Sequence, residues 1–441
     1  MRRAARAAET ISAEAAASLV RSGMWLEYGG IYSQPDLFDA ALGARTHDLH
    51  DLKIRSTLAM RPRAPVEADP DGRHVQMFSL HFGGYDRRLS DAGRCHYLPV
   101  NLGEIPDYYR RFIDPVDIVI LKCCPMDAAG FFNFSGANLY YRAFIERARL
   151  VIVETSTTLP YAHGVANGVH ASEVDYIIEG DNAPVPTLPN PAATAIDQAV
   201  ARLITSEIED GACLQIGIGG MPNAVCGLLA ESGVKDLGIH TEMLPDGLAE
   251  LYRKGLVTGA CKTLDPGKVV YTFAIGSEAL YRTIDHNPDL LCNALDYTNQ
   301  PHIIMQNPRA VAINSTTQVD LTGQAASESD GNRHISGTGG QAQFVRGAYA
   351  SEGGKSFICL PSTYDKRGAR RSRIVPTLTP GNTVTTTRAD MMYVVTEYGM
   401  VNLKGRSVPK RVRLLISIAH PDFREELERA AHRMGMLPRA F

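Results

Sequence analysis

The chain contains two similar halves, and this internal repeat restricts its fold more than any other feature. W-L-E-Y-G-G-I-Y-S-Q-P (Trp25 to Pro35) aligns with A-C-L-Q-I-G-I-G-G-M-P (Ala212 to Pro222), so that Gly30 corresponds to Gly217. Two further matches follow in the same order, 69–83 with 265–276 and 127–130 with 320–323. Similar βα units can produce similar strings, but three matches in one order favour a duplicated fold.

A proline-rich segment separates the two halves. D-N-A-P-V-P-T-L-P-N-P (Asp181 to Pro191) contains four prolines, which make a linker semi-rigid. The chain of 441 residues is too long for one core of ordinary size, and we predict two domains, residues 1–190 and 191–441. Apolar runs such as Val116 to Leu121 alternate with helical patterns such as Asn138 to Ala148. This alternation predicts two homologous open α/β domains with mainly parallel sheets, and a cleft between them for a ligand.

Charge and cysteine usage limit the partners and the compartment. The formal net charge of -3 provides no basic footprint, so we expect no nucleic-acid partner. The eight cysteines form no CxxC pair and several lie in apolar runs, which favours reduced thiols and a cytoplasmic location. Residues 1–17 read as an amphipathic helix, not as a signal peptide. No uninterrupted apolar stretch approaches the ~20 residues that span a membrane, so we expect no membrane association.

A glycine-rich turn and a glutamate mark the candidate active site in the second half. Gly217, Gly219 and Gly220 follow the apolar run Ala212 to Ile216 and precede a helical run. Glycines let a backbone approach a ligand, and the N–H groups that open a helix attract anions. Glu242 ends the next short apolar run, and ligand chemistry in open α/β sheets occurs at the carboxyl ends of strands. Taken singly, each signal also fits an ordinary connection or a helix cap.

These residues would support nucleophilic chemistry on a thioester. A carboxylate at Glu242 can attack the thioester carbonyl, form a mixed anhydride, and then hold the thiol as a glutamyl thioester. Such a step requires backbone donors aimed at the developing charge, each worth ~3–4 kcal/mol. The glycine cluster S-G-T-G-G (Ser336 to Gly340) could supply them. The first half has no counterpart of Glu242, so we expect one catalytic half and one supporting half.

The motifs Q-I-G-I-G-G-M-P-N-A, H-T-E-M, V-A-I-N-S, S-G-T-G-G-Q-x-x-F and V-T-E-Y-G occur in this order. This set resembles the acetyl-CoA hydrolase/CoA-transferase family, and within it the short-chain carboxylate CoA-transferases that use butyrate or 4-hydroxybutyrate. The resemblance covers nearly the whole chain. It implies acyl-CoA and a carboxylate as substrates, no permanently bound cofactor or metal, and a ping-pong mechanism through a glutamyl-CoA thioester. It also implies a homo-oligomer.

The resemblance also implies roles for individual residues. Glu242 matches the nucleophile and Gly340 the backbone oxyanion donor. Asn314 matches a polar residue near the acyl carboxylate, and Glu397 an acidic residue near the active site. Positions that match coenzyme A contacts are Gly217, Ile218, Gly219, Gly220, Met221, Gly337, Gly340 and Lys366.

The roles of two positions and of one arginine-rich stretch stay open at this point. Lys366 could face a coenzyme A phosphate or be a solvated loop lysine. Gln343 stands where the family pattern G-G-x-x-D-F has Asp, and the lost charge could alter acyl selectivity or only loop packing. The arginine-rich stretch Arg367 to Arg373 could likewise favour a dicarboxylate or phosphates, or be a solvated loop.

The prediction is therefore a CoA-transferase with acetyl-CoA or succinyl-CoA as donor and a butyrate-, 4-hydroxybutyrate- or itaconate-like acceptor. Two alternatives are an acyl-CoA hydrolase, which would admit water to the same Glu242 thioester, and a non-catalytic coenzyme A-binding protein. The presence of both H-T-E-M and S-G-T-G-G argues against the second alternative.

Overall fold

The chain folds into two compact units. A computed structural model describes residues 8–437. Unit 1 comprises Met1–Leu188 and Val270–Thr298, and unit 2 comprises Pro189–Val269 and Asn299–Phe441. The first segment of unit 1 ends at Leu188, close to the predicted domain boundary at residue 190. Val270–Thr298, in contrast, groups with unit 1, although the repeat assigns it to the second half.

Backbone hydrogen bonds tie this inserted segment to unit 1. The Ala274 N–H donates to the Gly136 carbonyl at 2.9 Å, and the Cys292 N–H donates to the His163 carbonyl at 2.7 Å. These bonds join the segment to unit 1 from a distant part of the sequence. Its elements are β15 (Phe273–Ala274), α10 (Glu278–Ile284), β16 (Leu290–Cys292) and α11 (Leu295–Thr298), and β14 (Val269–Tyr271) spans the passage into it.

Unit 1 contains an eight-stranded sheet in the order β1-β10-β8-β6-β2-β3-β4-β5, and every pairing in it is parallel. The strands are β1 (Glu9–Thr10), β2 (Trp25–Tyr28), β3 (Leu52–Ser56), β4 (Val75–Ser79), β5 (Cys95–Tyr97), β6 (Ile118–Cys123), β8 (Leu150–Thr155) and β10 (Tyr176–Glu179). The central strands β6 and β8 are apolar and buried along most of their length, as expected for a sheet covered on both faces.

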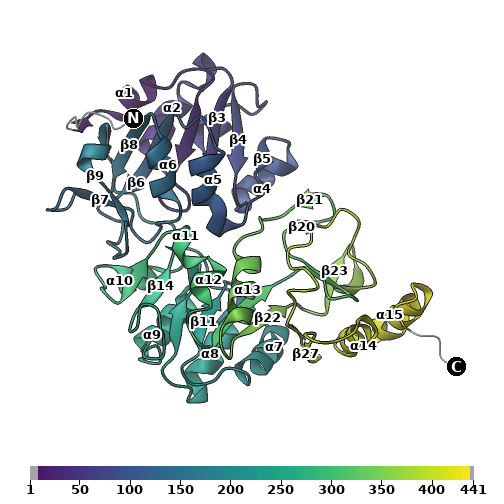
Figure 1. Ribbon diagram of the computed structural model, residues 1–441. Helices are drawn as coiled ribbons and strands as arrows, with labels where there is room; N and C mark the ends of the chain where they lie inside the picture. Colours follow the sequence, from purple (N-terminus) through teal and green to yellow (C-terminus); the bar gives the residue numbers. More distant parts are fainter. Residues whose placement is uncertain (1–7, 438–441) are drawn as a thin grey trace. The chain divides into compact units, whose positions relative to one another are not determined.

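Helices cover this sheet, and α5 and α6 lie side by side (Figure 1). The remaining elements are α1 (Ala13–Ser18), α2 (Leu37–Gly43), α3 (Ala64–Glu67), α4 (Gly84–Asp91), α5 (Ile105–Arg111), α6 (Tyr141–Arg147), β7 (Phe131–Asn133) and β9 (Gly168–His170). Within the described part, the amphipathic helix predicted for residues 1–17 is correct only from Ala13 on. Glu9–Thr10 form a strand, and α1 starts only at Ala13 because the Ser12 hydroxyl accepts the Ala15 N–H. Residues 1–7 lie outside the described range.

The sheet of unit 2 runs in the order β12-β11-β17-β22-β26-β27, parallel except for the antiparallel β27, and β14 and then β16 extend it beyond β12. Its strands are β11 (Cys213–Ile216), β12 (Gly238–His240), β17 (Ala310–Ser315), β22 (Lys355–Cys359), β26 (Tyr393–Thr396) and β27 (Gly399–Asn402). Smaller strands are β13 (Met243–Leu244), β18 (Gln318–Asp320), β19 (Ala325–Ala326), β20 (Ser329–Asp330), β21 (Arg333–His334), β23 (Thr363–Lys366), β24 (Ala369–Ser372) and β25 (Ile374–Val375).

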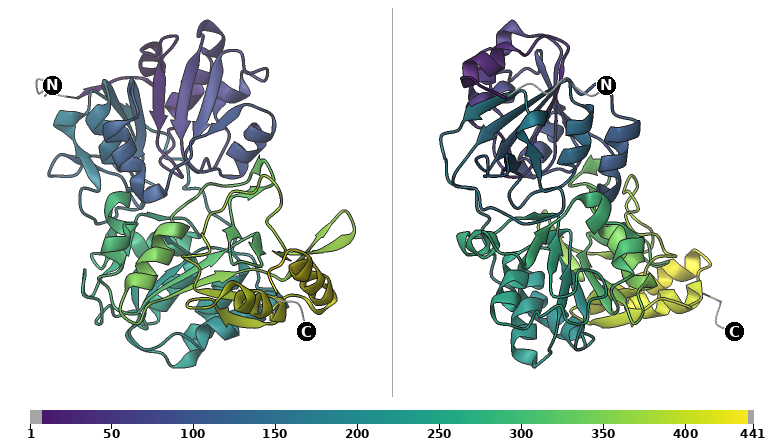
Figure 2. Two further views of the ribbon diagram at one scale, coloured as in Figure 1. Left: turned by 45° about the vertical axis from the view of Figure 1, so that its right-hand side comes forward. Right: turned by 60° about the vertical axis from the view of Figure 1, so that its left-hand side comes forward.

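The helices of unit 2 are α7 (Ala195–Thr205), α8 (Gly220–Ser232), α9 (Asp246–Arg253), α12 (Pro301–Ile304), α13 (Gln341–Ala350), α14 (Val408–Ser417) and α15 (Pro421–Arg433). The last two, drawn in yellow, pack together beside the hairpin β23–β24 (Figure 2). Their Val412, Leu415 and Leu427 are buried in one apolar cluster with residues of β22 and β26. No helix in residues 8–437 is long and apolar enough to cross a membrane.

The two sheets share a strand order, which confirms the predicted duplication and fold class. In unit 1 the order is β3-β2-β6-β8-β10, and in unit 2 it is β12-β11-β17-β22-β26, with the strands in the same succession along the chain. The repeat extends to single turns. The Asp127 carboxylate accepts the backbone N–H groups two and four residues on, and Asp320 does the same.

Candidate active site

Glu242 lies just beyond the carboxyl end of β12, where the parallel sheet of unit 2 presents its loops. Its Oε2 accepts a hydrogen bond of 2.5 Å from the Asn299 side-chain amide. Burial raises the pKa of the Glu242 carboxyl to about 7, because a charge is poorly solvated there, and the bond from Asn299 partly opposes this rise. Glu242 is therefore a carboxyl group that changes its charge close to neutral pH.

Gly340 packs directly against this carboxyl group. It caps the N-terminus of α13, and a Cβ at this position would overlap both Glu242 Oε2 and Asn299 Nδ2. Its φ is -96°, so close approach rather than a left-handed backbone requires glycine here. The glycine cluster thus brings bare backbone to the group that would attack a substrate.

Asn299 is the site residue that sequence reasoning missed. Its side chain is fully buried, and it lies 57 residues after Glu242 in the stretch T-N-Q-P. No local pattern marks this asparagine, because its place beside Glu242 depends on how distant segments pack. Only the match of a whole family motif around it could have revealed it.

The glycine-rich turn joins β11 to α8 as the sequence suggested. Gly219 has a φ of 123°, which favours glycine, and the thirteen-residue helix α8 begins immediately after it. At the tip of the turn the Ile218 side chain is 52% exposed, whereas Met221 is buried. An exposed apolar residue beside a helix N-terminus would suit a ligand with both apolar and anionic parts.

Two predicted residues make their hydrogen bonds elsewhere in unit 2. Asn314 on β17 exchanges side-chain hydrogen bonds with Gln215 on β11, at 3.2 and 3.4 Å. Glu397 follows β26 and accepts bonds from the backbone N–H and the hydroxyl of Ser362. Their expected roles near the acyl group stay predictions.

Lys366 lies on the exposed hairpin β23–β24, with its ammonium group 3.4 Å from the Asp330 carboxylate. Both side chains are about half exposed, so solvent screens this pair. A coenzyme A phosphate contact at Lys366 stays a prediction.

Comparison with known proteins identifies the chain. The N-terminal domain of the acetyl-CoA hydrolase/transferase family matches residues 2–189, and the C-terminal domain of that family matches residues 276–431. The chain belongs to this family. A butyryl-CoA:acetate CoA-transferase from Anaerostipes caccae is 44% identical over 96% of this chain and 95% of its own length. A 4-hydroxybutyrate coenzyme A transferase from Clostridium kluyveri is 43% identical over 80% of this chain and 81% of its own.

A solved structure agrees over nearly the full length. RipA from Yersinia pestis is 37% identical, covers 97% of this chain and 98% of its own, and superimposes with a TM-score of 0.89. Together with the curated relatives, this likeness confirms the prediction that the chain is a CoA-transferase of the acetyl-CoA hydrolase/transferase family. The departure from the family pattern, Gln343, is buried on the first turn of α13, three residues after Gly340.

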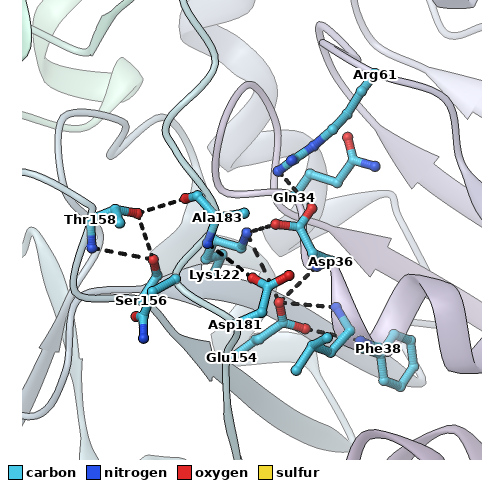
Figure 3. A network of polar contacts seen from close by, with 12 residues as sticks. Gln34, Asp36, Phe38, Arg61, Lys122, Glu154, Ser156, Thr158, Asp181 and Ala183 are labelled. Atoms are coloured by element: carbon cyan, nitrogen blue, oxygen red, sulfur yellow. Dashed lines mark hydrogen bonds and ion pairs between the residues drawn. The ribbon is translucent and has the colours of Figure 1, made fainter. Parts of the chain in front are cut away.

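In this family member, the sheet of unit 1 carries a polar cluster that the sequence did not predict. Lys122 and Glu154 are register partners near the carboxyl ends of β6 and β8, and both are buried. Figure 3 shows Asp36 between Lys122 and Arg61. The Lys122 ammonium pairs with Asp36 and lies 4.0 Å from Glu154 Oε1, and Arg61 pairs with Asp36 at 2.7 Å.

Glu154 also holds the start of α2. Its carboxylate accepts the backbone N–H groups of Asp36, Leu37 and Phe38 at 2.7 to 3.2 Å. Burial raises the pKa of Glu154, and these N–H groups and Lys122 oppose the rise. Asp36 and Glu154 are thus committed to cations and backbone N–H groups, in contrast to Glu242. Sequence signals existed, since Lys122 and Glu154 each interrupt an apolar run.

Proposed function

We propose that this chain transfers coenzyme A from an acyl-CoA donor to a short-chain carboxylate through a covalent glutamyl-CoA thioester at Glu242. The observation that carries the proposal is the half-buried side chain of Glu242, whose carboxyl group is held between the Asn299 amide and the Gly340 backbone. The named relatives support the substrate class, since they act on butyryl-CoA and acetate or on 4-hydroxybutyrate. Acetyl-CoA or succinyl-CoA would be the donor, and a butyrate-, 4-hydroxybutyrate- or itaconate-like acid the acceptor.

In the first half-reaction, the ionised Glu242 attacks the thioester carbonyl and the carbon–sulfur bond breaks. This leaves a mixed anhydride and coenzyme A thiolate. The thiolate then attacks the Glu242 carbonyl, and the donor acid leaves as its carboxylate. An acceptor carboxylate repeats these steps in reverse. No water enters, so the energy of the thioester bond is conserved from donor to product.

The neighbours of Glu242 would stabilise the charge that forms at its own carbonyl oxygen. The Asn299 amide already donates to Oε2, and the Gly340 N–H, at the start of the ten-residue helix α13, would be a second donor. Donors fixed before the reaction need no reorganisation when charge develops, and the loss of one costs ~3–4 kcal/mol. Ground-state binding would change much less, because the oxyanion exists only in the transition state.

The test is to mix the protein with acyl-CoA in the absence of an acceptor and to measure its intact mass. We expect an increase of one coenzyme A, mapped to the peptide that contains Glu242 and removed by hydroxylamine. Glu242→Ala should form no adduct and transfer no coenzyme A, whereas the exposed control Glu231→Ala should behave as the parent does. Transfer by an unmodified protein with both substrates bound would contradict the covalent route.

A second arm separates transfer from hydrolysis, because the family includes both activities. Thiol release from acetyl-CoA and succinyl-CoA is followed with and without a panel of carboxylates. A transferase forms a new acyl-CoA only when acceptor is present. Rapid thiol release without acceptor would favour the hydrolase.

A further inference from the structure

A buried carboxyl group lies beside the glycine loop Ser336–Gly340. Glu328 is 3% exposed and directly precedes the hairpin β20–β21. The chain returns to it after that hairpin, because the Ile335 and Ser336 N–H groups both donate to the Glu328 backbone carbonyl, at 2.8 and 3.4 Å. The backbone of Glu328 therefore fixes the start of the glycine loop.

The side chain of Glu328 holds this loop a second time. The hydroxyl groups of Thr338 and Thr385 hydrogen-bond to its carboxylate, and Thr385 Oγ1 also accepts the Ser327 N–H at 3.0 Å. Thr338 lies only two residues before Gly340. Between them, Gly339 has a φ of 62°, so the chain turns sharply from Thr338 to Gly340. A shift of Thr338 would be passed directly to Gly340.

The other end of the loop is tied to the same neighbouring segment. The Gln341 side-chain amide donates to Thr386 Oγ1 at 2.9 Å, next to Thr385. Gly340 is thus held on both sides, through Glu328 and Thr385 before it and through Thr386 after it. Such a double attachment fits a loop whose backbone must keep its position relative to the Glu242 carboxyl group to within about 0.5 Å.

The stability of the fold alone does not explain why a glutamate occupies position 328. Burial raises the pKa of its carboxyl group, and its Oε2 has no hydrogen-bond partner within residues 8–437. Among the described residues, only the hydrogen bonds from Thr338 and Thr385 oppose this rise in pKa. A buried acid with an unpaired oxygen normally costs free energy, so its presence calls for another reason.

We propose that Glu328 is a positioning residue for coenzyme A transfer, which fixes Thr338 so that the Gly340 N–H points at the carbonyl oxygen of Glu242. The proposal rests on the proposed function of Glu242. Glu328 itself gains and loses no bond to substrate in any step. Its contribution is geometric, and misplacement of a catalytic group by about 1 Å can cost about 100-fold in rate.

The test measures the rate at which the enzyme–coenzyme A adduct forms in a single turnover, over a range of acyl-CoA concentrations. Glu328→Ala and Thr338→Val should each slow adduct formation at saturating acyl-CoA by about 10- to 100-fold. The acyl-CoA concentration that gives half the maximal rate should change by less than about threefold. Glu328→Gln keeps one acceptor oxygen and should recover part of the rate. The double variant should be no slower than the slower single one, because both changes release the same contact.

Asp320→Asn is the matched control, since Asp320 is an equally buried acid of unit 2 that holds only its own turn. Parental adduct rates in folded Glu328→Ala and Thr338→Val, or an equal slowing in Asp320→Asn, would overturn the inference. Should Glu328→Ala fail to fold, the conservative Thr338→Val decides the matter. Absence of any adduct in the parent protein would instead overturn the proposed function, and this inference with it.

Discussion

Glu242 combines two requirements that oppose each other. Burial protects a glutamyl thioester from water, but the same burial favours the protonated carboxyl, which cannot attack a carbonyl. Asn299 moderates this conflict, because the hydrogen bond that its side-chain amide donates favours the ionised form of Glu242. The balance places the pKa of Glu242 at about 7, so that both forms are populated near neutral pH.

The first prediction concerns the pH dependence of the chemical step. The rate of adduct formation should rise with pH as Glu242 ionises, with a midpoint near pH 7 and a plateau above it. Quenched-flow mass spectrometry between about pH 5.5 and 8.5 would measure it. Asn299→Ala removes the interaction that lowers the pKa, so its midpoint should move to higher pH. A flat profile in the parent protein would be inconsistent with Glu242 as the attacking group.

The same carboxyl group should make stability depend on pH. Its pKa is raised from 4.5 in the unfolded chain to about 7 in the folded one, so the neutral form favours folding and this contribution is lost as pH rises through that interval. Glu242→Gln stays neutral. Its free energy of unfolding relative to the parent should therefore increase between pH 5 and pH 8, by at most about 3 kcal/mol. Urea titrations at both pH values would measure it, and an unchanged difference would argue against the raised pKa.

Gly340 is the residue at which one methyl group should matter most. In Gly340→Ala the new Cβ overlaps Glu242 and Asn299, so turnover should fall by about 100- to 1000-fold, with a much smaller change in acyl-CoA affinity. The control is Gly227→Ala in α8, where a Cβ meets nothing within 4 Å and alanine favours the helix. Steady-state kinetics would compare the two. Loss of binding with normal turnover would make Gly340 a ligand-contact residue.

At the scale of elements, the charged cluster of unit 1 ties the start of α2 to the ends of β6 and β8. Removing one member leaves a buried charge without its partner, so Lys122→Met should cost about 3–5 kcal/mol in the free energy of unfolding. The double variant Lys122→Met with Glu154→Gln should cost less than the sum of the two single changes. Denaturant unfolding of all four proteins gives the coupling energy.

The exposed ion pair between Arg142 and Glu173 provides the comparison for this cycle. Arg142→Ala should cost less than about 1 kcal/mol, since solvent screens the pair. Additive effects of Lys122 and Glu154 would mean that each residue acts alone. The cluster would then not be one structural unit.

Elements with a local signal could be predicted from the sequence, and contacts between distant segments could not. The apolar run before Gly217 and the glycines after it predict the β11–α8 turn, because strand and helix formers lie on either side of it. The β12 end that carries Glu242 was predictable for the same reason. The hydrogen bond to Asn299 was not, since 57 residues separate the two and no motif surrounds the asparagine. The pairing of Asn314 with Gln215 depends likewise on the strand register.

At the scale of the whole molecule, the repeat predicts the two sheets but not the division of the chain. The fragment 1–190 lacks Val270–Thr298, which is joined to unit 1 by backbone hydrogen bonds to Gly136 and His163. We expect this fragment to aggregate or to unfold at a much lower temperature than a fragment of 1–188 joined to 270–298 by a short glycine–serine linker. Soluble yield and thermal unfolding would compare them, and equal stability of the two would contradict a structural role for the segment.

The position of Val270–Thr298 in the chain also affects the order in which the two units can fold during synthesis. A ribosome that has released the first 188 residues must still make residues 189–298 before unit 1 is whole. At ~5–20 residues per second this takes about 5–20 s, during which β11 and β12 of unit 2 are already made. The first half of the nascent chain therefore waits without the backbone hydrogen bonds that Ala274 and Cys292 donate to it until Thr298 is made.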